Sequence, residues 1–509
     1  MHPHMYTQFL VLGLIFAFAD AYGIGANDVS NSFATSVSSG ALTLAQACCI
    51  AIVTEFCGAF FLGAKTADTV RSKIISVSLF DNNPALLMLG MFTALVGSSI
   101  FVIFATSRGW PVSTTHSITG AVAGMGIAAF GGNAVVWGWK GLAKIIVSWF
   151  LSPVVAGIVA SVLFLLTRFL VLESKDSFKR GLYAVPVFFF LTIWINIAFI
   201  LNNGLPGVKN KMPFAKTLWI GAVAGAGVAL FSYVFYSNWL RRRILEKEDL
   251  KWYHVFVTPF LPKQPLVPEE PAETTSDKVS GEVNLPLNNS DLGNQQANQS
   301  MFGKAKGFLL KGVNKDVRNL NNPKLADIHA RAKKFDSDTE NLFQFVQVLS
   351  ACAASFAHGS NDVANAVGPL TTIYQVWQSG VVPGAKASVT PWILAYCAVA
   401  LDIGLITYGY HIMRSLGNNI TWTTPSRGFC AELGTSLTVV TASKIGLPVS
   451  TTHCITGAMV GVGLCNGDVR AVNWKMFAIC FFSWVITLPF AGLVSGLLFA
   501  FVAYAPKSL

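Results

Sequence analysis

Long apolar stretches dominate this sequence and constrain its fold more than any other feature. Hydrophobic residues make up 53% of the 509-residue chain and charged residues only 12%, about half the charged share of a soluble domain. Most of the stretches reach the roughly 17–25 residues that span a bilayer as a helix, so the sequence predicts an all-α polytopic membrane protein. The apolar stretches cover residues 7–24, 41–64, 86–106, 142–170, 182–203 and 216–239, and then 342–357, 389–413, 428–445 and 475–503.

Charged residues are concentrated in one central region, residues 241–340, which holds 30 of the 61 Lys, Arg, Asp and Glu residues. The region is also rich in Pro, Asn and Gln, so it cannot bury enough apolar surface to fold as a domain. We predict a largely disordered loop with some helix near residues 307–335. Three consecutive arginines at 241–243 favour a cytoplasmic location. The chain therefore divides into an N-terminal membrane half (1–240), this loop (241–340) and a C-terminal membrane half (341–509).

The remaining composition excludes several classes of protein. The net charge of +11 comes from basic residues scattered through short loops, which is typical of positive-inside bias and not of nucleic-acid binding. The nine cysteines lie in or beside apolar segments without a Cys-x-x-Cys pair, which favours small buried side chains over disulfides or metal ligands. Residues 58–66 approach a nucleotide-binding loop but carry an extra alanine before the lysine. We therefore expect coupling to an ion gradient, and neither an ATPase nor another enzyme.

Two polar motifs occur twice in this apolar chain. The string Pro-Val-Ser-Thr-Thr-His occupies residues 111–116 and 448–453, and the eleven-residue windows that begin with it are identical at ten positions. Gly-Ala-Asn-Asp-Val-Ser-Asn-Ser at 25–32 likewise matches Gly-Ser-Asn-Asp-Val-Ala-Asn-Ala at 359–366. The two offsets are 337 and 334 residues, and the nearly constant spacing indicates an internal duplication.

The duplication makes the two membrane halves repeats of each other. Ser-Trp pairs at 148–149 and 483–484 add a third marker in the same order. Two repeats around a shared site near the bilayer midplane are the architecture of secondary transporters. The sequence alone leaves open whether the repeats are parallel or inverted, since that depends on whether each contains an even or an odd number of crossings.

Each Ser-Thr-Thr run follows a proline and precedes a stretch of small residues, so each is expected to begin a helix. Ser and Thr favour helix N-caps, where free backbone N–H groups and the positive end of the helix dipole bind anions. The helices that follow are interpreted as re-entrant half-helices. Two such ends facing each other would suit a tetrahedral oxyanion. Together the two runs would offer this anion six hydroxyl groups, from Ser113, Thr114, Thr115, Ser450, Thr451 and Thr452.

The Asn-Asp motifs supply hydrogen-bond acceptors instead. Asp28 and Asp362 would repel an anion unless cations lay between them. Carboxylates, amide carbonyls and unwound backbone carbonyls are the oxygen ligands that sodium takes in such sites. We therefore predict cation sites at both aspartates, which couple the two ligands because each binds better when the other is present. Alternatively, a protonated oxyanion could donate hydrogen bonds to these carboxylates.

Other polar residues in apolar surroundings have two interpretations each. Glu55 and Glu432 are functional candidates because a carboxylate in a membrane is costly, and the alternative is a structural pairing with a buried Thr or Asn. Asp20 either lines the same vestibule as the first Asn-Asp motif or lies at a helix end. His116 and His453 either hold the hairpin as neutral imidazoles or transfer protons.

Together the motifs resemble the inorganic phosphate transporter family, with the fungal-type and other eukaryotic sodium-dependent phosphate symporters as the most similar branch. The resemblance rests on the two duplicated motifs and on Pro-Ser-Arg-Gly-Phe-Cys-Ala-Glu at 425–432. It covers both halves and leaves the central loop unmatched. Ser30 departs from the alanine that is usual in the first motif.

The resemblance implies inorganic phosphate as the substrate, sodium as the coupling ion and no further cofactor. It also implies about twelve membrane segments in two inverted repeats with re-entrant helical hairpins, and a homodimer in many members. The expected location is the plasma membrane, with an organellar membrane as the alternative. Carried onto this chain, it assigns phosphate contacts to the six hydroxyls with Asn27 and Asn361, sodium contacts to Asp28, Asp362, Asn31 and Asn365, and essential membrane acids to Glu55 and Glu432.

The sequence therefore predicts a sodium-coupled phosphate symporter that works by alternating access in the lipid bilayer. Within the transporter class, the alternatives are proton coupling and another oxyanion such as sulfate or arsenate. From another class, the alternative is a phosphate-sensing receptor that binds its ligand and transports little.

Overall fold

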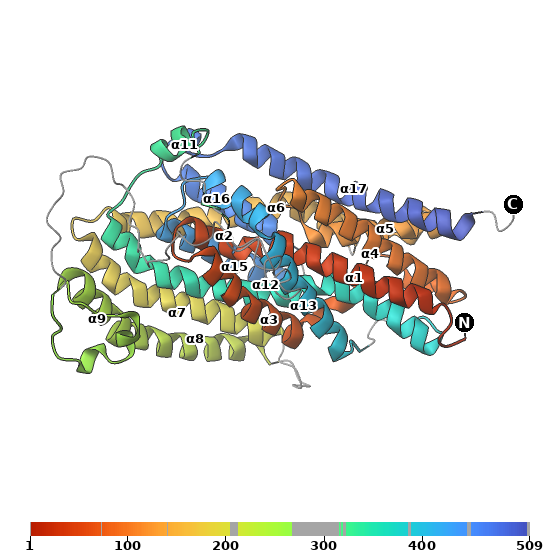
Figure 1. Cartoon of the computed structure of the whole chain (residues 1–509), viewed down its shortest axis with the longest axis horizontal. Helices are drawn as coiled ribbons and strands as arrows, with labels where there is room; N and C mark the ends of the chain where they lie inside the picture. Colours follow the sequence, from red (N-terminus) through yellow and green to blue (C-terminus); the bar gives the residue numbers. More distant parts are fainter. Residues whose placement is uncertain are drawn as a thin grey trace, which may run out of the picture.

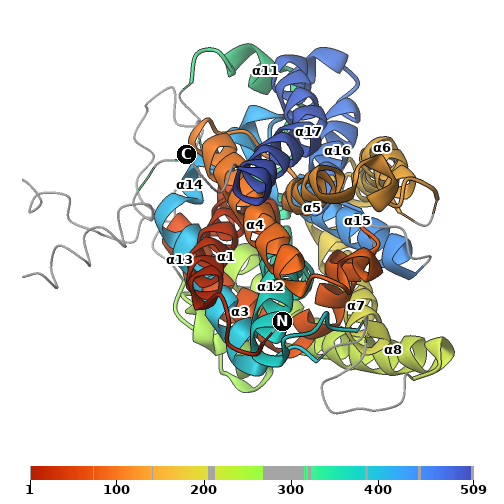
Figure 2. The same ribbon diagram turned by 90° about the vertical axis from the view of Figure 1, so that its right-hand side faces the viewer.

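Long helices run side by side along the longest axis of the molecule in the computed structural model (Figure 1). Viewed along that axis, they pack as a bundle of several layers (Figure 2). The structure describes residues 2–72, 74–139, 141–203, 212–266, 315, 317–318, 322–384, 388–444 and 449–505. Much of the loop predicted to be disordered lies outside these residues, as does Pro448 of the second Pro-Val-Ser-Thr-Thr-His motif.

The helices of the first half account for nearly all of its described residues. Two of them, α1 and α2, meet at the first Asn-Asp motif, and α5 begins at the first Ser-Thr-Thr run. The helices are α1 (Thr7–Asp28), α2 (Ser30–Ser38), α3 (Leu44–Ser72), α4 (Pro84–Ser107), α5 (Thr114–Phe130), α6 (Leu142–Thr167), α7 (Ser177–Asn203), α8 (Phe214–Phe231) and α9 (Ser237–Leu240), with the short helices η1 (Val77–Phe80), η2 (Gly132–Ala134), η3 (Arg168–Leu172), η4 (Ser232–Tyr236) and η5 (Arg241–Leu245).

The central region and the second half are also helical where the structure describes them. The second Asn-Asp motif lies within α12, and α16 begins at the second Ser-Thr-Thr run. The helices are η6 (Trp252–Phe256), η7 (Thr258–Phe260), α11 (Ala326–Arg331), α12 (Ser337–Ser379), α13 (Pro391–Tyr408), α14 (Tyr410–Ser415), η8 (Gly417–Asn419), α15 (Pro425–Lys444), α16 (Thr451–Leu464), η9 (Val469–Ala471) and α17 (Trp474–Tyr504).

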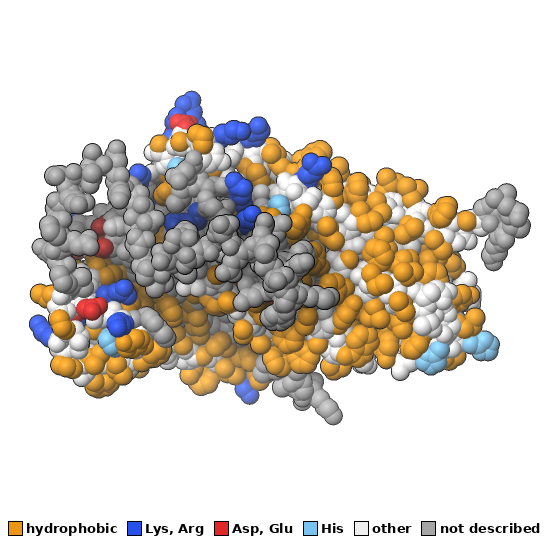
Figure 3. Space-filling view, viewed as in Figure 1, with side chains coloured by type: hydrophobic (Ala, Val, Ile, Leu, Met, Phe, Trp, Pro, Cys, Tyr) orange, Lys and Arg blue, Asp and Glu red, His pale blue; other side chains and the backbone are white. Residues whose placement is uncertain are grey.

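Nine helical segments of the described chain are long and apolar enough to cross a membrane. They coincide with nine of the ten predicted apolar stretches, and the tenth forms α15. In the part of the molecule where Figure 1 labels α1, α4, α5 and α17, hydrophobic side chains cover most of the visible face, as expected for a surface in contact with lipid (Figure 3). The prediction of an all-α multi-pass membrane protein is confirmed, whereas twelve segments and an inverted relation of the repeats stay predictions.

The helices that follow the Ser-Thr-Thr runs are short and closely packed. They contain 17 residues in α5 and 14 in α16, at or below the length that spans a bilayer. Helix α5 packs along α17 and α16 packs along α6. A Cβ atom on Gly124 would lie 2.0 Å from the carbonyl oxygen of Gly492, and one on Gly461 would lie 2.3 Å from that of Gly157. Small residues thus let the backbones approach closely, as in other membrane helix pairs.

The backbone at the two Asn-Asp motifs is more regularly helical than the sequence predicted. The second motif lies inside α12, a continuous helix of 43 residues, and the first is interrupted only at Val29, whose φ and ψ of −63° and −26° are still helical. Because helical carbonyls already accept intrahelical bonds, the prediction of unwound carbonyls as cation ligands is wrong for this conformation. The side chains of these motifs are therefore the candidate cation ligands.

The two halves interlock and do not form separate bundles. Helix α12 of the second half packs along α3 of the first, and α13 packs along α1. The backbones again touch through glycine, since a Cβ on Gly25 would lie 1.8 Å from the carbonyl oxygen of Leu401, and one on Gly404 would lie 2.0 Å from that of Tyr22. Both Asn-Asp motifs are therefore held next to helices of the opposite half.

Candidate functional site

The carboxylate of Asp28 joins the two Ser-Thr-Thr motifs. It lies at the last residue of α1 and is 2% exposed. The hydroxyl of Thr114 donates to its Oδ2 at 2.6 Å, and that of Thr452 donates to its Oδ1 at 3.0 Å. The first residues of α5 and α16 therefore converge on a single aspartate, as expected for two helix ends that face each other.

The carboxylate of Asp362 has a different set of partners, all on α12. His358 lies one helical turn earlier, and its Nε2 is 2.6 Å from Oδ2 of Asp362. The side-chain amide of Asn361 donates to Oδ1 at 2.9 Å. Side chains four residues apart share one face of a helix, which explains the contact between the histidine and the aspartate.

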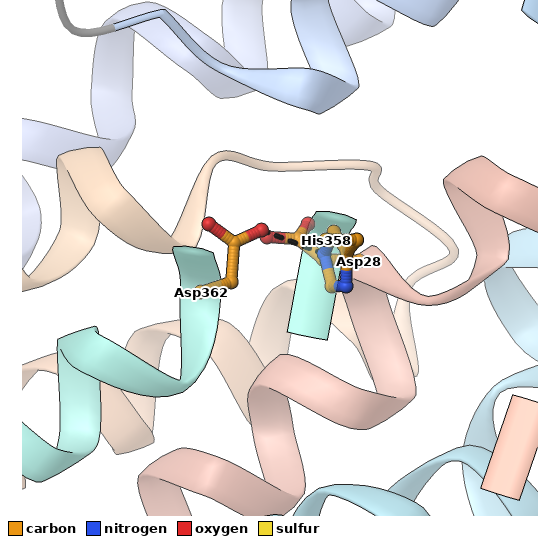
Figure 4. Close-up of side chains that lie close together, drawn as sticks. All are labelled: Asp28, His358 and Asp362. Carbon is orange, nitrogen blue, oxygen red and sulfur yellow. Dashed lines mark ion pairs between the residues drawn. The ribbon is translucent and has the colours of Figure 1, made fainter. Parts of the chain in front are cut away.

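His358 also contacts Glu55 and so links three acidic side chains of the membrane core. Its Nδ1 lies 2.9 Å from Oε2 of Glu55 on α3, and the hydroxyl of Ser355 donates to Oε1 at 2.7 Å. Asp28, His358 and Asp362 each present a ligand atom within 4.8 Å of the others (Figure 4). The structure thus groups Asp28, Asp362 and Glu55 around one imidazole.

Asn31 and Asn365 connect the Asn-Asp motifs to the hydroxyl runs. The amide of Asn31 donates to the hydroxyl of Thr452 at 2.8 Å. The amide of Asn365 donates to the hydroxyls of Thr114 and Thr115, both at 3.2 Å. In each case an asparagine from one half contacts a threonine from the other, so the predicted site residues form one network across the halves.

The other predicted donors have varied surroundings. Ser113 and Ser450 are the N-caps of α5 and α16, and their hydroxyls accept backbone N–H bonds at 3.4 and 3.5 Å. Thr451 is partly exposed and, like Asn361, lines a cavity. Asn27 uses its amide on Thr106 and on the carbonyl of Trp110, and its Oδ1 on the N–H of Val112. Asn27 therefore positions the turn before α5, and a direct phosphate contact for it stays a prediction.

Glu432 lies away from the imidazole and takes only neutral donors. The hydroxyls of Thr35 and Ser36 donate to its Oε1 at 2.6 and 3.0 Å, and the amide of Gln347 does so at 3.3 Å. The hydroxyl of Ser350 donates to Oε2. A pairing with buried hydroxyls was the structural interpretation of this residue, although Glu432 also borders the cavity.

The cavity opens between the halves beside these groups. It is bordered by α2, α7, α12, α15 and α16, and polar side chains from both halves face it. Four of its polar lining residues were predicted from the sequence, and Ser32, Asn196, His358, Thr435 and Ser436 were missed. His358 could have been found from its spacing, since it stands four residues before Asp362 in an apolar helix. Ser32, Thr435 and Ser436 carry no such signal. The polar side chains that line the cavity are Asn31, Ser32, Asn196, His358, Asn361, Glu432, Thr435, Ser436 and Thr451.

The duplicated histidines lie against aromatic rings. The rings of His116 and His453 are 5.0 Å apart. His453 stacks on Trp484 at 3.9 Å, and the indole N–H of Trp484 donates to the carbonyl of Pro111 at 2.9 Å. These contacts pack the two Pro-Val-Ser-Thr-Thr-His motifs together.

The electrostatics of the cluster favour a cation. Asp28, Asp362 and Glu55 are at most 2% exposed, and ionised carboxylates removed from water cost several kcal/mol each unless they are compensated. One imidazolium can balance only one of three negative charges. Two monovalent cations held by these oxygens would offset the other two, while the helix ends of α5 and α16 point positive charge at the same place. The arrangement can therefore bind a cation and an anion side by side.

Comparisons with known proteins point to one family. A model of the phosphate transporter family matches residues 24–495. The phosphate-repressible phosphate permease pho-4 of Neurospora crassa is 37% identical over 99% of each chain. The sodium-dependent phosphate transporter 2 of Felis catus is 31% identical over 98% of each chain. The solved structure of a sodium-dependent phosphate transporter is similar with a TM-score of 0.70 and 29% identity, over 98% of this chain and 100% of that one.

Proposed function

The chain belongs to the phosphate transporter family, and from this membership we propose that it carries inorganic phosphate across a membrane together with sodium ions. Transport proceeds by alternating access of the site between the halves to the two sides of the membrane. The names of its relatives support sodium as the coupling ion over protons.

In this proposal the phosphate binds to donors at the first turns of α5 and α16. Thr451 and Asn361 line the cavity, and Thr115 is partly exposed, so their polar groups are within reach of a ligand. A tetrahedral oxyanion has four oxygens to satisfy, and the free N–H groups at two helix N-termini supplement the side-chain donors.

The sodium ions bind to the side-chain oxygens of Asp28 and Asp362, with amide oxygens of Asn31 and Asn365 beside them. The observation that carries the proposal is the joint contact of Asp28 with Thr114 and Thr452. A cation at this carboxylate and an anion at those hydroxyls would be adjacent, so each would raise the affinity for the other.

Uptake of labelled phosphate into proteoliposomes tests the function directly. We expect uptake that is stimulated by an inward sodium gradient and is competed weakly by sulfate. Uptake that is indifferent to sodium and follows a pH gradient would replace sodium by protons as the coupling ion. Phosphate binding without uptake would identify a receptor.

Three further properties complete the proposal. The protein performs no covalent chemistry on phosphate and needs no cofactor besides its coupling ion. It resides in the plasma membrane, which fluorescence microscopy of the tagged full chain would check. It assembles as a homodimer, which cross-linking in native membranes would detect as a species of twice the monomer mass.

A further inference from the structure

The segment that follows α9 forms a small folded unit at one end of the bundle, which we call the juxtamembrane hairpin (residues 241–266). An antiparallel bridge pairs Glu248 with Leu266, and the N–H of Asp249 donates to the carbonyl of Pro265 at 2.9 Å. The short helices η6 and η7 lie between these two ends. The hairpin therefore begins in the last turn of the membrane span Phe214–Leu245 and closes on itself after the span ends.

Arg242 is the centre of the hairpin and makes it rigid. The guanidinium is buried and donates twice to Oε2 of Glu248, at 3.1 and 2.7 Å. It also donates to the carbonyls of Thr258, Leu261 and Pro262 at 2.8, 3.0 and 2.7 Å. These bonds account for the five N–H donors of the side chain. Of the three consecutive arginines, one is thus structural and the other two are exposed.

The apolar side of the hairpin lies along the membrane span. The ring of Phe256 is 6.1 Å from that of Phe231, and the ring of Phe260 is 6.4 Å from that of Phe235. Phe231 and Phe235 precede the end of the span by 14 and 10 residues, or roughly 15–21 Å of helix. The chain therefore folds back along the helix toward the bilayer.

These aromatic rings coincide with the expected boundary of the hydrocarbon. The span of 32 residues is about 48 Å long, whereas the hydrocarbon core is about 30 Å thick. Its last turns must extend through the headgroup layer. Phe260 is 82% exposed and Phe256 59% exposed, which is unfavourable in water and expected at a membrane interface.

The same hairpin carries several exposed basic side chains. Arg243, Lys247, Lys251 and Lys263 are exposed, whereas Asp249 is the one exposed acidic residue of the described hairpin that forms no ion pair. At the end of the molecule where Figure 1 labels α9, hydrophobic and basic side chains lie next to each other, with acidic side chains among them (Figure 3). Such a surface is complementary to an acidic lipid headgroup layer.

We infer that the juxtamembrane hairpin is a binding site for acidic phospholipid headgroups, with Phe256 and Phe260 inserted at the interface and Lys251 and Lys263 facing the headgroups. The occupant is the lipid surface next to the span. The rigid centre at Arg242 holds the aromatic and basic residues in place before lipid binds, so little ordering is required. Acidic lipid thereby stabilises the end of the helix that leads into the central loop.

The test uses the purified full-length protein in detergent, titrated with phosphatidylserine or with phosphatidylcholine while its thermal unfolding is followed. We expect phosphatidylserine to raise the unfolding temperature more, and high salt to remove the difference. Lys251→Gln with Lys263→Gln should weaken the apparent affinity for phosphatidylserine about thirtyfold. Lys175→Gln with Lys179→Gln, which removes two exposed charges before and within α7, is the matched control and should leave it unchanged.

A second pair of variants separates lipid binding from misfolding. Phe256→Ser with Phe260→Ser should reduce the stabilisation by both lipids, while phosphate uptake in phosphatidylcholine vesicles stays at the wild-type level. An equal response to phosphatidylserine in the wild type and the double-lysine variant would overturn the inference. So would stabilisation that is equal for the two lipids, or a hairpin that binds a soluble protein in preference to vesicles.

Discussion

The two Asn-Asp motifs have nearly the same sequence but different partners. Asp28 accepts hydrogen bonds from the hydroxyls of Thr114 in the first half and Thr452 in the second. Asp362 instead contacts His358 and Asn361 on its own helix. The difference begins in the sequence, because the residue at the position of His358 in the first repeat is Ile24. A duplicated pair of carboxylates has thus diverged into one with neutral donors and one with an ionisable partner.

The two membrane glutamates repeat this contrast. Glu55 contacts the imidazole of His358, while Glu432 accepts bonds from the uncharged side chains of Thr35, Ser36, Gln347 and Ser350. The imidazole of His358 therefore contacts Glu55 and Asp362, whereas Glu432 and Asp28 accept hydrogen bonds from uncharged side chains. Equivalent positions in two repeats need not have equivalent roles, and substitutions at matched positions can measure the difference.

The largest effect is expected when either aspartate loses its charge. Asp28→Asn and Asp362→Asn should each lower sodium-stimulated phosphate uptake by more than about tenfold, because one buried charge-assisted contact contributes about 1.5–3 kcal/mol. Proteoliposome uptake across a sodium titration measures this. Asp176→Asn, at an exposed carboxylate, is the control. Normal sodium dependence in both variants would refute the cation sites, and a loss in only one would show that the motifs bind sodium unequally.

Replacing the glutamates is expected to lower maximal phosphate uptake by large but unequal factors. Glu55→Gln removes a charge beside His358, and breaking a buried pair of this kind costs about 3–5 kcal/mol. Glu432→Gln leaves an amide oxygen that can still accept from the hydroxyls, so its maximal uptake should fall only several-fold. Maximal uptake per reconstituted protein measures both. Equal losses would mean that the imidazole does not distinguish the two sites.

Replacing the threonines is expected to weaken phosphate binding moderately. Thr451→Val should raise the half-saturation concentration for phosphate by about 2- to 12-fold, because the net free energy of one hydrogen bond corresponds to a change of this size. Thr114→Val should raise it for phosphate and for sodium together, because this hydroxyl also donates to Asp28. Thr441→Val, at an exposed position of α15, serves as the control. Unchanged kinetics in either variant would remove that hydroxyl from the site.

The smallest effect is expected at the helix caps. Ser113→Ala and Ser450→Ala should each cost about 0.5–2 kcal/mol, at the lower end because the capping bonds are long, at 3.4 and 3.5 Å. Thermal unfolding of the purified protein should show equal, small decreases, with phosphate affinity reduced slightly. A much larger decrease for one serine would indicate a role beyond capping at that motif.

Much of the site could be predicted because its residues occur in duplicated motifs. The hydroxyl runs, both aspartates and both glutamates were proposed from the sequence, and the predicted helix starts at the two runs are confirmed, with Ser113 and Ser450 as the N-caps. His358 was missed because it does not occur twice, since the matching position of the first repeat holds Ile24. The unwound backbone expected at the motifs was wrong at the second motif, which lies inside the continuous α12, whereas the first is interrupted at Val29 alone.

The sequence by itself determined that this chain is a multi-pass helical membrane protein with paired donors and carboxylates, since apolar length and motif repetition are local properties. Only the tertiary structure decided which donor meets which carboxylate. Thr452 and Asp28 are 424 residues apart, and they meet because glycine contacts bring the helices of the two halves together. The tertiary structure also decided that Arg242 is buried while its neighbours face outward, because one guanidinium satisfies three backbone carbonyls that only the folded hairpin brings together.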